Sequence, residues 1–192
     1  MSEPNTPTPQ SLEGRLLVAS PYVPHTHFAR TVVLVVRARE QGTKGIILNR
    51  PLGPLGNAVW KHVGIEGERP DRPVFFGGPI AGPLVALHQD ESLGEYRLGA
   101  NLFVASNASH VGQLVERSPD SPLRVFVGHA GWSAEQIARE VRQGVWMVLP
   151  ADARAVFAWD VDLWSTSIRR VGRRVLESFL SRAALGSDPN RN

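Results

Sequence analysis

The chain has 192 residues, 42% of them hydrophobic, which suits one domain with a packed core. It contains no cysteine, so disulfides, thiol catalysis, zinc ribbons and iron–sulfur clusters are excluded. Its 21 basic and 18 acidic residues give a net charge of +3 at pH 7, and residues 167–182 alone hold five arginines against one glutamate. The rest of the chain therefore carries 3 − 4 = −1, and most of the surface is predicted to be nearly neutral.

The two ends of the chain are polar and poor in apolar residues. Residues 1–13 combine proline and acid where a secretory signal would carry base and an apolar run. The longest apolar stretch, Val32–Val36, is far shorter than the ~20 residues that span a bilayer. We therefore expect a cytoplasmic protein without membrane association. It should have a disordered tail over 1–12, one domain over 13–183 and a flexible tail over 184–192.

Strand signals dominate the first two thirds of the chain. Segments rich in β-branched or other apolar residues and bounded by Pro, Gly or Asn predict strands over 14–19, 31–37, 44–49, 73–76, 84–89, 96–105, 123–128 and 145–149. Val32–Val36 is apolar at every position, which is typical of a central strand covered on both faces.

Helix signals come later. Apolar spacing predicts helices over 108–117 and 134–143, the second with Ser133 as N-cap in a capping box with Gln136. Asp152 can cap a short helix. A final helix is predicted to bury a stripe of residues and to place its arginines opposite; the stripe is Trp164, Ile168, Val171, Val175 and Phe179. Short links early and helices later favour an α+β fold with a mixed sheet over a doubly wound parallel one.

The strongest local motif joins the predicted strand 123–128 to the capped helix through Gly128-His129-Ala130-Gly131-Trp132. Free backbone N–H groups at a glycine turn and a helix start can bind an anion. The alternative is that the glycines only permit a sharp turn while Trp132 packs on the sheet. The motif is neither a phosphate-binding Walker loop nor a nucleophile elbow.

Two other strand ends offer candidates. Asn49-Arg50-Pro51 ends one strand, and Arg50 can act as a fork for phosphate or carboxylate, or the segment is only a turn. Gly77-Gly78-Pro79 can bring backbone close to a ligand, or it ends a buried strand. If these turns and Gly128–Trp132 form one pocket, they should converge at one end of the molecule.

Other polar residues carry weaker signals. The histidines, which include His25, His27, His88, His110 and His129, show no recognisable ligand spacing, so we predict no metal and no cofactor. The best candidate for nucleic-acid binding is the basic face of the final helix, formed by Arg169, Arg170, Arg173 and Arg174.

Several runs together resemble one family in order and spacing. They are Gly14–Pro21, Phe28–Val33, Gly45–Pro51, Val74–Pro79, Gly128–Trp132, Gly144–Trp146, Phe157 and Asp162–Trp164. Over residues 14–172 this pattern resembles the AlgH/YqgE family of bacterial proteins. The resemblance implies an α+β fold with a mixed, largely antiparallel and partly barrel-like β core flanked by helices.

The resemblance also implies a cytoplasmic protein, and the family takes its name from a member described as a transcriptional regulator. It supplies no catalytic residues to carry over. This sequence departs from the family pattern at His129, where tyrosine is usual, and at Glu135 and Ala138, which replace a glycine and an acid. His129 brings a group that titrates near neutral pH.

Three hypotheses follow. The first is a non-enzymatic regulatory or adaptor protein that binds a partner, most simply another protein, with no oligomeric state indicated. The second is a small-ligand module or enzyme whose site contains residues from the three turns, namely Asn49, Arg50, Gly77, Gly78, His129, Gly131 and Trp132. The third is direct DNA binding through the arginines of the final helix.

Overall fold

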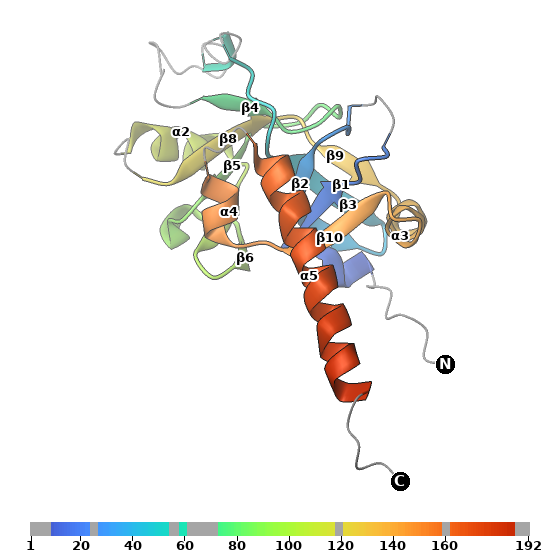
Figure 1. Cartoon of the computed structure of the whole chain (residues 1–192). Coiled ribbons are helices and arrows are strands. Elements are labelled where there is room, and N and C mark those ends of the chain that lie inside the picture. The colour runs from blue at the N-terminus through green and yellow to red at the C-terminus, as the bar shows by residue number, and fades with distance from the viewer. Residues whose placement is uncertain are drawn as a thin grey trace.

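The structure is a computed structural model that describes residues 9–23, 27–53, 58–60, 73–117, 121–158 and 162–186 (Figure 1). The candidate His25 and most of the two predicted tails lie outside these residues. Five antiparallel strands form sheet A in the order β10 (Trp146–Pro150), β1 (Arg15–Ala19), β2 (Val32–Arg39), β3 (Gly42–Ile47) and β9 (Ala130–Trp132).

Sheet B also has five strands, and its order is β4 (Val74–Phe76), β8 (Leu123–Val127), β5 (Val85–His88), β7 (Leu102–Ala105) and β6 (Tyr96–Gly99). Among the strand pairs of sheet B that the structure describes, only β4–β8 is parallel. The helices whose two ends both lie in described residues are η1 (Pro9–Leu12), η2 (Glu91–Leu93), α2 (Ala108–Glu116), α3 (Ala134–Arg142), α4 (Ala153–Phe157) and α5 (Leu163–Gly186).

Alternation along the strands builds three apolar clusters. In β2, Val32 and Leu34 enter a central cluster that also receives Leu87 and Phe126 from sheet B, while Val33 faces the opposite side. The central cluster therefore joins the inner faces of the two sheets, as the two-residue period of a strand requires. Every residue of Val32–Val36 is fully buried, which confirms a central strand covered on both faces.

Helices cover the outer faces of the sheets. Ile137 of α3 and Leu12 of η1 pack in the cluster outside sheet A, and Leu114 of α2 packs in the cluster outside sheet B. The central cluster is completed by Val156 of α4 and Leu163 of α5. None of the helices in the described part of the chain has the length and apolarity needed to cross a membrane.

The α+β class and the largely antiparallel pairing are confirmed. In the described residues the β core is not closed into a barrel but consists of two open sheets. The chain passes from sheet A to sheet B after β3 and returns to sheet A after β8, so each sheet keeps two edge strands. The single strand predicted over 96–105 is a hairpin of β6 and β7, which turns at Asn101 with φ of +53°.

The bounds predicted for the two tails also differ from those in the structure. Residues 9–12, assigned to the disordered tail, form η1, and Leu12 is 1% exposed because it packs under sheet A. Residues 184–186, assigned to the flexible tail, continue α5.

Candidate functional site

The three turns singled out in the sequence converge where the chain crosses between the sheets. The Arg50 carbonyl accepts a hydrogen bond from Phe76 N–H at 2.7 Å, and the Gly77 carbonyl accepts one from Ile47 N–H at 2.8 Å. Ile80 and His129 exchange two backbone hydrogen bonds of 2.9 Å. These bonds connect all three turns into one backbone network, which we call the crossing.

Glycines in the crossing allow backbones to touch. A Cβ on Gly78 would lie 2.2 Å from the His129 carbonyl carbon, and a Cβ on Gly128 would lie 2.3 Å from the Gly78 carbonyl oxygen. Gly78 and Gly128 also have φ of +150° and +72°, which L residues rarely adopt. Close packing of the chain on itself thus accounts for both glycines without a ligand.

The Gly128–Trp132 segment differs from the predicted turn. Ala130–Trp132 is strand β9, which pairs with Thr43–Gly45 of β3, so this stretch joins a ladder instead of forming an open loop. The segment contains only three strand residues and two glycines, which is why its sequence shows no strand periodicity. At the start of α3, the Ser133 hydroxyl accepts the predicted capping hydrogen bond from Gln136 N–H at 3.0 Å.

The Gln136 side chain does not complete the predicted capping box, because it donates to Glu140 at 2.8 Å. Glu140 also accepts hydrogen bonds from the indole N–H groups of Trp132 at 3.1 Å and Trp146 at 2.7 Å. The two indoles meet edge to face at 5.7 Å between ring centroids, and Phe28 contacts both. Trp132 is thus a structural side chain, 6% exposed, held by a carboxylate of α3.

Asn49 and Arg50 fasten a neighbouring loop. The Asn49 side chain accepts from Val32 N–H at 3.0 Å and donates to the Arg30 carbonyl at 2.8 Å. Arg50 donates to the Ala29 carbonyl at 2.5 Å. The guanidinium predicted as an anion fork therefore bonds the loop that precedes β2.

His129 is the half-buried member of the crossing. A Cβ on Gly82 would lie 3.3 Å from its Nδ1, so the ring packs against the backbone of the following loop. Burial, and then the charge of Lys44, lowers the pKa of His129 below its ordinary value. The lowered pKa favours the neutral form of the ring.

A cavity of about 420 Å³ lies elsewhere, between α2 and the end of β5. Its lining residues are His88, Gln89, Asp90, Glu91, Leu114, Arg117, Ser121, Pro122 and Leu123. Arg117 and Asp90 form an ion pair across it. This concave site was missed in the sequence because its residues come from segments about 30 positions apart, with no motif at either end.

His88 is the buried titratable group beside this cavity. Its side chain is 1% exposed, and its Nδ1 accepts a hydrogen bond from Asp90 N–H at 3.3 Å, which places the proton on Nε2. Within the described residues Nε2 has no hydrogen-bond partner. Burial, followed by the charge of Arg117, lowers the pKa of His88 to about 4, so the ring is neutral near pH 7.

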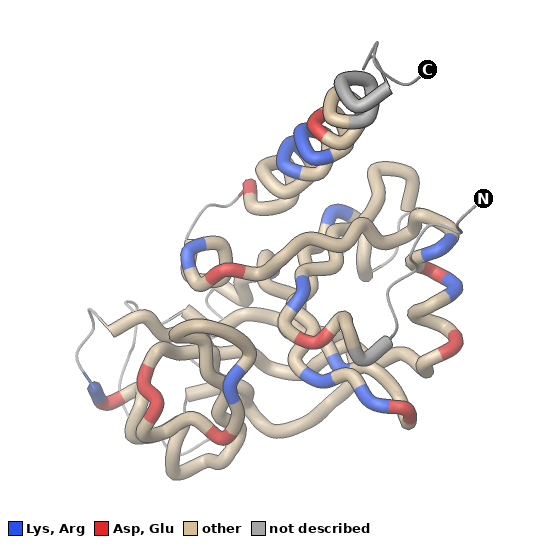
Figure 2. Tube along the Cα trace, turned by 90° about the horizontal axis from the view of Figure 1, so that it is seen from below, with Lys and Arg blue, Asp and Glu red and all other residues tan. Residues whose placement is uncertain are grey.

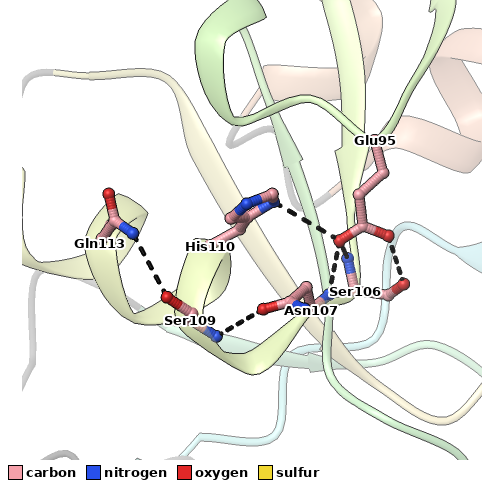
Figure 3. Close-up of polar contacts among 6 residues, drawn as sticks. All are labelled: Glu95, Ser106, Asn107, Ser109, His110 and Gln113. Carbon is pink, nitrogen blue, oxygen red and sulfur yellow. Dashed lines mark hydrogen bonds and ion pairs between the residues drawn. The ribbon is translucent and has the colours of Figure 1, made fainter.

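Figure 3 shows a polar cluster at the start of α2 that brings together an acid, a histidine and hydroxyls. Glu95 accepts from Asn107 N–H at 2.5 Å, from Ser106 N–H at 2.7 Å and from the Ser106 hydroxyl at 2.8 Å. Burial raises the pKa of Glu95, but these hydrogen bonds together hold it below its ordinary value.

The order of contacts in this cluster does not suit nucleophilic catalysis. The Nδ1 atom of His110 lies 3.8 Å from Glu95, and the Ser106 hydroxyl donates to the same carboxylate instead of to the imidazole. A serine nucleophile needs the base next to its hydroxyl and the acid behind the base. Here the carboxylate stands in the middle, where it anchors the N-terminus of α2.

Helix α5 changes character along its length. Up to Val171 it packs on the body, with Leu163 buried and the Trp164 indole donating to the Ala19 carbonyl at 2.8 Å. Every residue over 172–181 is exposed, and the helix runs past the sheets and away from them (Figure 1). We call residues 172–181 the α5 extension.

The α5 extension displays apolar side chains that the sequence assigned to the core or to no role. Val175 and Phe179, predicted to be buried, are 53% and 70% exposed, because the body ends before them. Leu176 and Leu180, outside the predicted stripe, are 59% and 61% exposed. The 24 residues of α5 give a helix about 36 Å long, so part of it extends beyond the surface of the body.

Basic side chains accompany this apolar surface, and Figure 2 shows the basic positions that recur along α5. Arg170 bonds Asp152 at 3.2 Å, and Arg169 donates to the Thr166 hydroxyl at 3.0 Å. Arg173 and Arg174 form no ion pair with any residue that the structure describes. Two of the four arginines predicted to contact nucleic acid thus already have partners within the chain.

Residues 16–176 match a family model described as AlgH-like, which covers most of the chain. This protein belongs to the AlgH-like family. An AlgH-like relative from Thermobifida fusca, named UPF0301 protein, is 38% identical over 180 residues, covering 84% of this chain and 88% of the relative. A UPF0301 protein of Myxococcus xanthus is 31% identical over 170 residues, covering 85% and 92%.

Solved structures agree with this AlgH-like fold. A crystal structure of a Corynebacterium diphtheriae protein has a TM-score of 0.67 and 28% identity, with 88% of this chain and 90% of that chain covered. The solution structure of the AlgH protein of Pseudomonas aeruginosa has a TM-score of 0.68 and 23% identity, covering 88% and 89%. The family match ends at residue 176, so residues 177–181, half of the α5 extension, lie beyond it.

Proposed function

We propose that this AlgH-like protein is a non-enzymatic regulatory or adaptor protein that acts by binding a partner macromolecule. The observation that carries the proposal is the α5 extension, whose four large apolar side chains are each more than half exposed. Burying the exposed part of such a side chain yields about 1–2 kcal/mol, so together the four offer several kcal/mol to a complex. Exposed apolar clusters of this kind mark interaction surfaces.

The polar groups elsewhere support a binding role over catalysis. Four polar side chains form hydrogen bonds within the fold, to indoles, to backbone groups or to the side chains of Ser106 and Gln136; they are Glu140, Glu95, Asn49 and Arg50. Within the described residues no group of three His, Cys, Asp or Glu side chains has the geometry to hold a metal ion.

Affinity capture with a matched pair of variants tests the proposal. The full chain, tagged at its N-terminus, is compared with Leu176→Gln/Phe179→Gln and with the control Ser178→Ala/Ser181→Ala in lysate with and without nuclease. We expect wild type and control to retain a common partner and the apolar variant to retain at least tenfold less. A purified protein that turns over a defined metabolite, and loses turnover on His129→Ala or Arg50→Ala, overturns the proposal.

A second candidate is small-ligand binding, favoured by the cavity beside α2. Its volume of about 420 Å³ lies in the range of small-molecule sites, and its lining combines the Arg117–Asp90 pair with apolar Leu114 and Leu123. Thermal shift against a panel of small carboxylates and phosphates tests this candidate. A ligand must raise the melting temperature of wild type but not of Leu114→Trp, which fills the cavity.

A further inference from the structure

We propose that the α5 extension inserts into an apolar groove with an acidic rim on a protein partner. This inference rests on the proposed function and names the chemistry of the partner. Its basis is the arrangement of apolar and basic side chains on a helix that no described part of the chain covers.

The apolar side chains form a continuous surface. Val175 and Phe179 are four residues apart, as are Leu176 and Leu180, so each pair lies one turn apart on the same side of the helix. The two rows are adjacent, because successive residues turn by about 100°. The resulting surface spans residues 175–180, fewer than two turns, and its Leu176, Phe179 and Leu180 have the i, i+3 and i+4 spacing that amphipathic helices use in grooves.

Arginines lie along one edge of that surface. Arg169 and Arg173 precede Leu176 by seven and three residues, which places all three on one side of the helix. Up to residue 181, α5 carries four arginines and one acidic residue, Glu177. Arg173 and Arg174 have no ion-pair partner in the described residues, so carboxylates on a partner would find them available.

The charge and the apolar surface together favour an acidic protein groove over three other occupants, which are a second copy of this chain, a nucleic acid and a lipid surface. A second copy would bring the same arginine-rich helix close to the first, and the like charges would repel. A phosphate backbone would neutralise the arginines but leave Phe179 and Leu180 in water. A lipid surface would accept both, but the apolar surface spans fewer than two turns at the end of a helix that is fixed to the body at Trp164.

Site-specific photocrosslinking in living cells tests the proposal. A benzophenone amino acid replaces Phe179, or replaces Tyr22 as the control, since Tyr22 is an aromatic residue that is 93% exposed on another part of the molecule. We expect adducts from position 179 and not from position 22. The crosslinked partner peptide should carry apolar residues and an excess of Asp and Glu. Arg169→Glu/Arg173→Glu should lower the adduct yield at least tenfold, whereas Arg169→Lys/Arg173→Lys should largely preserve it.

Each other outcome overturns the inference. Adducts to a second copy, to lipid or to nucleic acid identify a different occupant, and a partner peptide without excess acid removes the charge argument. If affinity capture finds a partner but position 179 gives no adduct, the inference fails and the proposed function stands. If neither experiment finds a partner, both fail. Circular dichroism should show unchanged helicity and melting temperature for each variant. A loss of adduct then results from the changed surface of the helix and not from unfolding.

Discussion

Replacing Gly78 by alanine should disrupt the crossing between the sheets. The new Cβ would lie 2.2 Å from the His129 carbonyl carbon and 2.4 Å from Ala130 N, so backbone and not a flexible side chain must move. The φ of +150° adds about 1–3 kcal/mol of strain for a residue other than glycine. The clash and the strain together should lower the free energy of unfolding by about 3 kcal/mol or more, or prevent the chain from folding.

Two matched substitutions calibrate this number. Gly144→Ala carries strain from a φ of +71° but has open space around its Cβ, so it should cost about 1–2 kcal/mol. Gly131→Ala would meet only the tip of the Ile80 side chain at 2.9 Å, which can rotate away, so its cost should be under about 1 kcal/mol.

Urea unfolding followed by tryptophan fluorescence measures all three variants. The expected order of destabilisation is Gly78→Ala, then Gly144→Ala, then Gly131→Ala. A Gly78→Ala protein as stable as Gly144→Ala would refute the reasoning that close backbone packing requires this glycine. The crossing would then need another explanation, and a ligand that approaches the backbone would be the first to consider.

Further predictions address the helices and buried polar groups. Gly112 lies inside α2 with open space around it, so Gly112→Ala should stabilise the protein by about 0.5–1 kcal/mol, seen as a higher melting temperature. Glu140→Leu leaves two indole N–H groups without their acceptor and should cost about 2–4 kcal/mol in urea unfolding, with a shift in tryptophan emission; an unchanged midpoint would contradict this. The pKa of His88 is about 4 in the folded protein against 6.5 in the unfolded chain, so the unfolded chain binds more protons between these values and stability should fall by up to about 3 kcal/mol as pH drops from 6.5 to 4. In His88→Asn that acid-side loss should be smaller, and equal slopes for the two proteins would argue against a buried neutral imidazole. Glu95→Gln should weaken the dependence of stability on pH around and below 4.5, because the lowered pKa of Glu95 stabilises the fold at higher pH and this contribution is lost as the carboxylate protonates.

The sequence predicts elements with strong periodicity well. Strand β2 shows its double burial in five consecutive apolar residues, and α3 shows its start in Ser133 and its end in Gly144, whose φ is +71°. Strand β9 escapes prediction because it is short, contains glycine and is defined by pairing with β3, which is distant in the sequence. Local patterns cannot reveal such pairing.

The candidate site shows the same division between local and distant information. The glycines of the crossing are visible in the sequence, but which backbones they touch depends on Ile80 and His129 meeting across two loops. The role of Glu140 depends on two tryptophans that approach it from β9 and β10. Burial of Val175 and Phe179 was predicted wrongly because helical spacing reports an apolar face but not how far the body beneath it reaches.

The pairing of β1 with β10 has a consequence for how the chain matures on the ribosome. Arg15 pairs with Pro150, so β1 gains its outer neighbour only after the intervening residues 20–145 have been made. Until then, the β1 edge stays open to other chains, and such edges promote aggregation. Sheet A can therefore be completed only once residues 146–150 have been made, and the need for a chaperone should be greatest before that point.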